Sequence, residues 1–199
     1  MRDGECVTPR GLTAPHRLWN GKGTALFGHW DYRMRTIAAL LFLLWPIAAI
    51  AQDAPTLLQQ YNDWEAYRYD GGGQKTCYIL SKPKTLAPTN RNHGDVFFFL
   101  TSRPAENVYN EVSILVGYPF APDGQVTVDI DGQVFTLFTK DDGAWVEQPA
   151  DEKQLVEAMK AGRSMVVKGQ SARGTATTYT FSLSGVTAGT NRLTSECPN

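Results

Sequence analysis

Short apolar runs, each ended by turn-forming residues, follow one another from residue 64 to residue 184. The runs are rich in β-branched and aromatic residues, which favour strands. The predicted strands are Trp64–Tyr69, Thr76–Ser81, Val96–Thr101, Val112–Gly117, Gln125–Ile130, Gln133–Thr139, Ala144–Glu147, Ser164–Gly169 and Thr177–Ser184. This spacing predicts a mainly β fold, a small antiparallel β-sandwich or barrel-like domain with one or two short helices.

Three of these runs also indicate how their faces are used. Residues 126–130 and 179–183 alternate apolar with polar side chains, as half-buried antiparallel strands do. The dipeptide Asp131-Gly132 lies between two runs and favours a two-residue hairpin turn. By contrast, residues 96–100 are apolar on both faces, which predicts a strand covered on both sides, or one whose outer face binds something.

Helical signals are confined to the C-terminal third of the chain. Asp151 is a predicted N-cap, Gln154 would complete a capping box, and Gly162 ends the pattern. The buried side of this helix would carry Leu155, Val156 and Met159. A second, weaker helix is predicted over residues 188–195, with Cys197 just beyond its end.

The N-terminal part of the chain has the pattern of a secretory signal peptide at residues 34–51. Met34-Arg35 gives a cationic start, residues 37–50 are largely apolar, and Ala49-Ile50-Ala51 provides small residues for cleavage near Ala51. The competing interpretation is a spanning helix, but the run is shorter than the roughly 20 residues that a bilayer needs. We therefore expect a periplasmic or secreted protein with no membrane span after cleavage.

This signal divides the chain into four parts. Residues 1–33 lack strand or helix periodicity and are interpreted as a mis-assigned N-terminal extension, the alternative being a cytoplasmic extension of an uncleaved anchor. Residues 52–62 form a short polar lead. Residues 63–199 are predicted to be a single β domain.

The net charge argues against one class of partner, and the cysteine content predicts a disulfide. The net charge of −1, with both signs mixed along the chain, gives no basic face for nucleic acid. Cys6 lies before the signal, which leaves Cys77 and Cys197 in an oxidising compartment. We expect these two to form one intramolecular disulfide, the alternative being a mixed or intermolecular pair.

A series of short motifs runs in order from residue 63 to residue 197. They are Asp63-Trp64, Cys77 with Ser81-Lys82-Pro83, Asn110-Glu111-Val112, Gly117-Tyr118-Pro119-Phe120, Ala144-Trp145-Val146, Met159-Lys160-Ala161-Gly162, residues 166–175, Phe181-Ser182-Leu183-Ser184-Gly185 and Cys197. Together they resemble the invasion-associated locus B family. The resemblance implies a β-rich protein exported by an alphaproteobacterium, in a family named after a locus linked to entry into red blood cells.

The family name is a poor guide to activity, because most members come from bacteria that invade no such cell. Many members carry a further cysteine pair near the first strands, where this chain has only Cys77. That departure counts against a redox role. The resemblance thus implies fold and compartment, with host interaction or envelope function as the biological setting.

Sets of residues that perform catalysis or bind metal are missing from the exported part. Its one histidine, His93, is interpreted as a loop histidine without partners, so we assign no catalytic residue and expect His93→Ala to leave the biological effect unchanged. The same scarcity of ligands argues against zinc. Oxygen ligands for Ca²⁺ exist at Asp129, Asp131, Asp141 and Asp142, but plain turn residues are the preferred interpretation. No metal or cofactor is assigned.

The most distinctive polar cluster is Arg173-Gly174-Thr175. A guanidinium beside a glycine suits a carboxylate or phosphate, so these residues are a candidate anion or partner contact. The preferred alternative is an arginine that pairs within the fold, with Glu111 or with backbone carbonyls. Aromatic residues outside the clearest strands would form a contact patch or complete the core, namely Tyr109, Tyr118, Phe120 and Trp145.

These observations predict a non-enzymatic binding protein whose partner is an unknown protein, a glycan or an envelope component. The first alternative is a periplasmic carrier of a small apolar ligand, in which the Phe97–Phe99 face lines a cavity. An enzyme of unfamiliar design is a further alternative. The sequence leaves the oligomeric state open.

Overall fold

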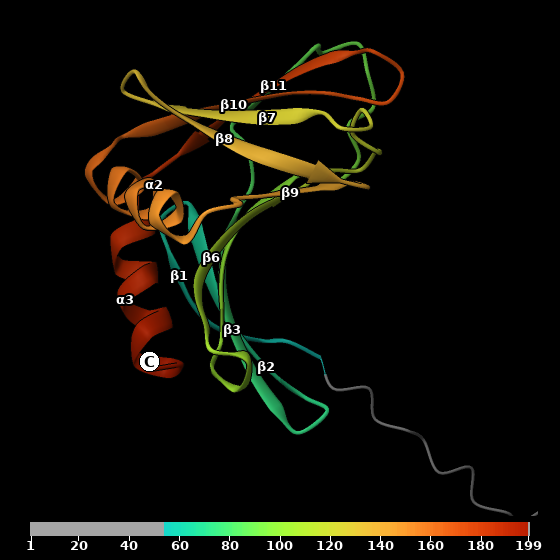
Figure 1. Ribbon diagram of the computed structural model, residues 1–199. Coiled ribbons are helices and arrows are strands. Elements are labelled where there is room, and N and C mark those ends of the chain that lie inside the picture. The colour runs from blue at the N-terminus through green and yellow to red at the C-terminus, as the bar shows by residue number, and fades with distance from the viewer. Residues whose placement is uncertain (1–53, 199) are drawn as a thin grey trace, which may run out of the picture. The chain divides into compact units, whose positions relative to one another are not determined.

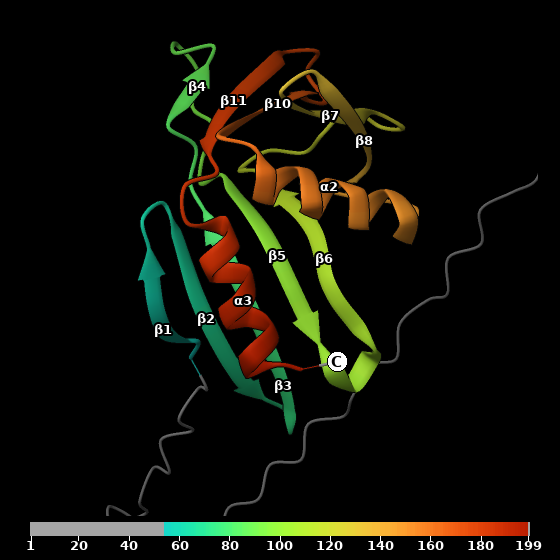
Figure 2. The same cartoon turned by 90° about the vertical axis from the view of Figure 1, so that its left-hand side faces the viewer.

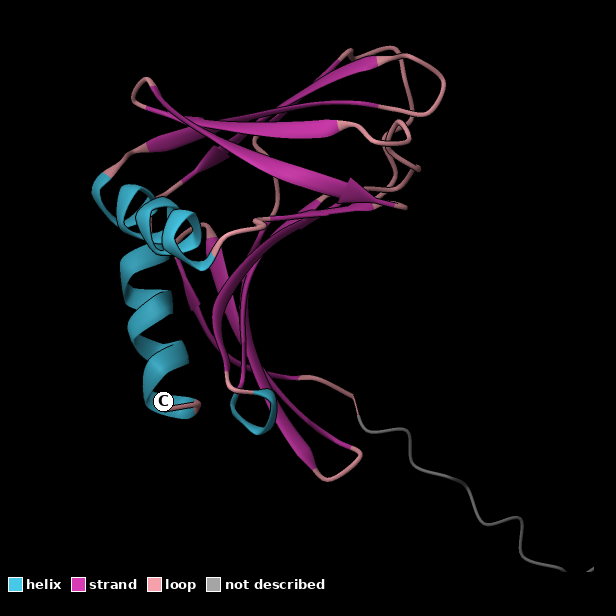
Figure 3. Cartoon of the chain, in the orientation of Figure 1, coloured by secondary structure: helices cyan, strands magenta, loops and turns pink. Residues whose placement is uncertain are grey.

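The computed structural model describes residues 54–198, which form one antiparallel sheet with two α-helices packed on it (Figures 1 and 3). The strands are β1 (Thr56–Tyr61), β2 (Trp64–Gly71), β3 (Gln74–Ser81), β4 (Thr85–Ala87), β5 (Phe97–Arg103), β6 (Val108–Leu115), β7 (Gln125–Ile130), β8 (Gln133–Lys140), β9 (Gly143–Trp145), β10 (Ser164–Gln170) and β11 (Ala176–Ser182). The helices are α2 (Pro149–Ala161), α3 (Val186–Glu196) and a 3₁₀ turn, η2 (Pro104–Glu106). The mainly β, antiparallel prediction is confirmed.

The sheet is continuous, in the order β1-β2-β3-β5-β6-β9-β8-β7-β10-β11-β4. Short β9 joins two halves, one built on β2, β3, β5 and β6, the other on β7, β8, β10 and β11. Figure 2 shows α3 lying along β2, β3 and β5, with α2 near the junction of the halves. The predicted extension 1–33 and signal peptide 34–51 lie outside the described residues.

Each of the nine predicted strands is present, but two further strands were missed. β1 lies inside the predicted polar lead, residues 52–62, and Leu57 on it is 52% exposed. It is an edge strand that pairs with β2, and its half-buried side chains, Leu58 and Tyr61, pack against the core. β4 has three residues and pairs with β11 at the other edge, too short for a periodic signal.

The predicted turn and the second helix are confirmed, while the cap of the first helix is not. Asp131 and Gly132 have φ of 52° and 87° and connect paired Ile130 and Gln133. α2 begins at Pro149 without a side-chain cap, so Asp151 lies in the first turn. The physical reason is that Pro149 suits the first helical position, where the missing N–H costs nothing.

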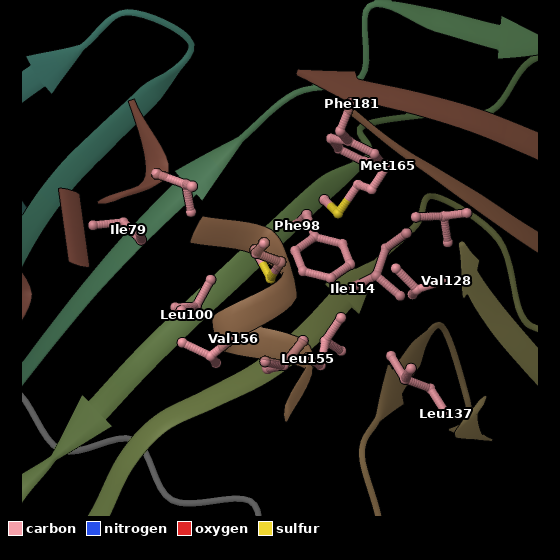
Figure 4. Close-up of a cluster of buried hydrophobic side chains, with 14 of the residues drawn as sticks. Ile79, Phe98, Leu100, Ile114, Val128, Leu137, Leu155, Val156, Met165 and Phe181 are labelled. Carbon is pink, nitrogen blue, oxygen red and sulfur yellow. The ribbon is translucent and has the colours of Figure 1, made fainter. Parts of the chain in front are cut away.

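A buried aromatic cluster holds the two halves of the sheet together. Phe98 of β5 lies in the middle of the core shown in Figure 4 and has no exposed surface. Its ring meets Trp64 and Phe181 edge-on, with centroids 6.5 Å and 5.6 Å away. The indole Nε1 of Trp64 donates to the carbonyl of Ser182 at 3.0 Å, so β2, β5 and β11 are joined.

The outer face of β5 is only partly covered. Phe97 and Phe99 are half-buried there, with ring centroids 5.9 Å apart. Tyr78 packs against Phe99, and the Lys82 ammonium lies 5.1 Å from the centre of the Phe97 ring. The expectation of a strand fully covered on both sides therefore holds only for its inner face.

The predicted disulfide joins Cys77 of β3 to Cys197, which ends α3. Both cysteines are buried, and 120 residues separate them. Next to the bond, the carboxylate of Glu196 accepts from Arg68 at 3.0 Å and from Arg192 at 3.1 Å. Arg68 holds the pKa of the Glu196 carboxyl below its usual value. The last helix is thereby fastened to the first half of the sheet.

Candidate functional site

A pocket of about 590 Å³ opens where three loops meet at the β10–β11 turn. Its walls come from residues 90–93, residues 117–119, and residues 171–177. The volume lies within the range of roughly 300–1,000 Å³ that small-molecule sites occupy. Most of the residues that line it are polar or charged, so the pocket offers hydrogen-bonding groups to a polar ligand.

Close backbone contact between two glycines holds two of these loops together. The N–H of Gly117 donates to the carbonyl of His93 at 3.0 Å. A Cβ on Gly117 would lie 2.5 Å from the Cα of Gly94, closer than atoms can approach. On the other side, the N–H of Ala172 donates to the Pro119 carbonyl at 2.9 Å. The pocket walls are thus fixed by main-chain contacts.

His93 lies at the floor of the pocket and is only 7% exposed. Its Nε2 is 3.0 Å from the Pro88 carbonyl, which can only accept, so Nε2 carries a proton. Its Nδ1 is 2.8 Å from the hydroxyl of Tyr179, which donates to it in the neutral ring. The prediction of a partnerless loop histidine is therefore wrong, because folding brings β11 beneath this loop.

The hydrogen-bonded chain continues through Tyr118. Its hydroxyl lies 2.7 Å from that of Tyr179 and 2.7 Å from Oγ1 of Thr177. Thr177 Oγ1 also lies 3.3 Å from the Gly169 carbonyl. Burial raises the pKa of Tyr179, so this phenol stays protonated at neutral pH. The floor is a chain of three hydroxyls and one imidazole within hydrogen-bond distance of one another.

Two arginines from separate loops, Arg91 and Arg173, line the same pocket. Both are exposed, and within residues 54–198 neither is within 4.0 Å of a carboxylate. No acidic residue is among those that form the walls in the described part of the chain. The local charge is therefore positive, and an anion is the complementary ligand.

Two residues of the predicted cluster Arg173-Gly174-Thr175 line the pocket, and the third shapes the β10–β11 turn. Arg173 and Thr175 line the pocket, while Gly174 has a φ of +79° and shapes the turn that presents them. The alternative partner proposed for Arg173 is wrong: Glu111 instead accepts from Arg103 at 2.8 Å and 3.3 Å.

Of the four aromatic candidates, only Tyr118 and Phe120 lie side by side, with ring centroids 5.6 Å apart. Tyr118 lines the pocket, Phe120 is buried in the core, Tyr109 is half-buried on β6, and Trp145 packs near Phe138 with ring centroids 6.1 Å apart. The four residues therefore do not form one exposed patch.

The acidic candidates for a cation site lie in turns. Asp129 accepts from the N–H of Gly132 at 2.9 Å, and Asp131 and Asp141 have φ of 52° and 54°. Asp142 accepts at its main-chain carbonyl from the N–H of Val116. Over residues 54–198, no group of three or more acidic, histidine or cysteine side chains is arranged to hold a metal ion. The same range contains no helix long and apolar enough to cross a membrane.

Replacing His93 with alanine is now expected to lower stability by about 1–3 kcal/mol, because the Tyr179 hydroxyl and Pro88 carbonyl would lose their partner. Urea unfolding of the exported protein measures it. The control is Arg91→Ala, a neighbouring exposed side chain without an ion pair, which should change stability by less than about 0.5 kcal/mol. Equal midpoints for the wild type and His93→Ala would contradict the structural role of the histidine.

A family model described as "Invasion associated locus B (IalB) protein" matches residues 64–194. The crystal structure of invasion associated protein B from Bartonella henselae aligns with a TM-score of 0.47 and 16% sequence identity. That alignment covers 71% of this chain and 98% of the other. No curated protein matches the chain. The range matched by the family model includes every residue that lines the pocket.

Proposed function

Because the chain belongs to the invasion associated locus B (IalB) protein family, we propose that it is an exported, non-enzymatic binding protein that holds a small polar ligand in the β10–β11 pocket. The periplasm, or the medium after secretion, is its place of action. Support for export comes from the signal pattern at residues 34–51 and from the pairing of Cys77 with Cys197.

The proposal rests on the hydrogen bonds that His93 makes at the pocket floor. Both ring nitrogens of His93 have partners within the protein, the Pro88 carbonyl and the Tyr179 hydroxyl. A general base needs a free nitrogen that can reach the reacting proton. The histidine therefore builds the pocket, and the groups left over are those that bind.

The apolar-carrier alternative receives less support. Phe97 and Phe99 lie on the outer face of the sheet, packed with Tyr78 and Lys82, and neither lines the pocket. An apolar molecule in the β10–β11 pocket would leave its polar and charged side chains without partners. The residues at the β10–β11 pocket suit a hydrated, polar molecule instead.

Equilibrium dialysis of the exported protein against the low-molecular-weight fraction of the bacterial envelope tests binding. Mass spectrometry identifies what is retained, and Thr175→Trp, which fills the pocket from its wall, is the matched variant. We expect at least one polar compound to be retained by the wild type and released by the variant. Retention of nothing, or equal retention by both proteins, would rule out the pocket as the binding site.

Intact-mass measurement of the protein exported by the bacterium tests whether the signal peptide is cleaved and whether residues 1–33 belong to the protein. We expect a chain that begins at Gln52 and carries one disulfide. A product that retains residues before Met34 would contradict both the cleavage and the mis-assigned start.

A further inference from the structure

The side chains at the mouth of the pocket differ from those at its floor in their hydrogen bonding. The side chains of Asn90, Arg91, Arg173 and Thr175 line it, and within residues 54–198 none forms a hydrogen bond to the protein. The floor hydroxyls, by contrast, are bonded to one another. A ligand can therefore be held by the mouth without disturbing the floor.

The two guanidinium groups define the charge that this ligand must carry. Arg91 belongs to the loop after β4 and Arg173 to the β10–β11 turn, and both contribute to one pocket with no carboxylate in its walls. A guanidinium offers a planar fork of N–H donors that fits the paired oxygens of a carboxylate or phosphate. Two such forks from separate loops favour an oxyanion in the mouth.

The remaining groups indicate what is attached to the oxyanion. The Asn90 amide and Thr175 hydroxyl both donate and accept, which matches hydroxyl groups on a ligand. The rings of Tyr118 and His93 add flat surfaces, with centroids 6.4 Å apart. Neutral apolar molecules would leave all of these polar groups unpaired.

Building on the proposed binding function, we propose that the pocket binds a small, hydroxyl-bearing oxyanion, whose carboxylate or phosphate lies between Arg91 and Arg173. The two sources of that chemistry are a sugar acid and a phosphorylated small molecule. Loss of one arginine should weaken binding about tenfold, since one charge-assisted contact is removed. Binding should also weaken as salt rises, because the mouth is exposed.

Isothermal titration of the exported protein at low ionic strength tests the proposal, with galacturonate, inorganic phosphate and uncharged galactose as probes. The variants are Arg91→Gln, Arg173→Gln and the double variant. Arg163→Gln is the matched control, because Arg163 is exposed, makes no ion pair within the described residues, and lies at the opposite end of β10.

We expect galacturonate or phosphate to bind, each arginine variant to lose about tenfold, and Arg163→Gln to bind as the wild type does. Preference for galacturonate assigns a sugar acid, and preference for phosphate assigns a phosphorylated ligand. The proposal is overturned if neither anion binds, if the double variant binds as well as the wild type, or if galactose binds as tightly as galacturonate. Retention of a neutral compound in the dialysis, with no anion binding, would leave the pocket's binding function standing while refuting the oxyanion.

Discussion

The exported protein with Cys77 replaced by serine should melt about 10 °C or more below the wild type. The disulfide closes a loop with a sequence separation of 120 residues, and removing it restores unfolded-chain entropy worth about 5 kcal/mol in the chain-entropy model. That is comparable with the roughly 5–15 kcal/mol by which a domain is stable. At room temperature most of the β content should remain, because the sheet is paired independently of Cys197.

Circular dichroism during heating measures this effect, and Cys197→Ser is the matched variant because it breaks the same bond from the helical side. Both variants, and the reduced wild type, should melt together. A wild-type protein with two free thiols after aerobic purification would contradict the closure, as would a predominantly disulfide-linked dimer on a non-reducing gel.

Substitution of Phe98 by alanine should cost about 3–5 kcal/mol, the range for removing a buried phenyl ring. The ring is fully buried between Trp64 and Phe181, so its loss leaves a cavity where the two halves of the sheet meet. Urea unfolding followed by tryptophan fluorescence measures the change, since Trp64 reports on this contact.

The control for Phe98 is Phe138→Ala, which removes the same group from a side chain that is 43% exposed. It should cost less than about 1.5 kcal/mol, because little of its apolar surface is removed from water. Similar losses for the two variants would mean that Phe98 does not hold the core together.

Much of the sheet could be predicted because its strands have one buried face. On β7 and β11 the alternation of apolar and polar residues matches alternation of buried and more exposed positions. β1 carries no such signal, because its two half-buried side chains, Leu58 and Tyr61, lie three residues apart and its pairing with β2 shifts register between Leu57 and Gln59. The N-cap of α2 is not at Asp151 as predicted, because Pro149 is also a helix-start signal and the helix begins there.

The site could be predicted only where its chemistry is contiguous in sequence. Arg173 and Thr175 lie two residues apart, and their residue types made them a candidate anion contact beside the preferred alternative of an arginine paired within the fold. Arg91 and His93 are some eighty residues earlier and meet that turn only through tertiary contacts, including the close approach of Gly94 to Gly117. A contact between residues that are distant in the chain leaves no local sequence pattern from which it could be predicted.

The central claim is that this protein binds its ligand in the pocket between Arg91 and Arg173. Backbone amide NMR of the isotope-labelled exported protein, titrated with galacturonate and then with phosphate, locates binding most directly. We predict that shift changes concentrate at residues 90–94, 117–119 and 171–177 and disappear in the Arg91→Gln, Arg173→Gln double variant. Changes centred instead on the outer sheet face, at Phe97, Phe99 and Trp145, or no changes with either anion, would contradict the account.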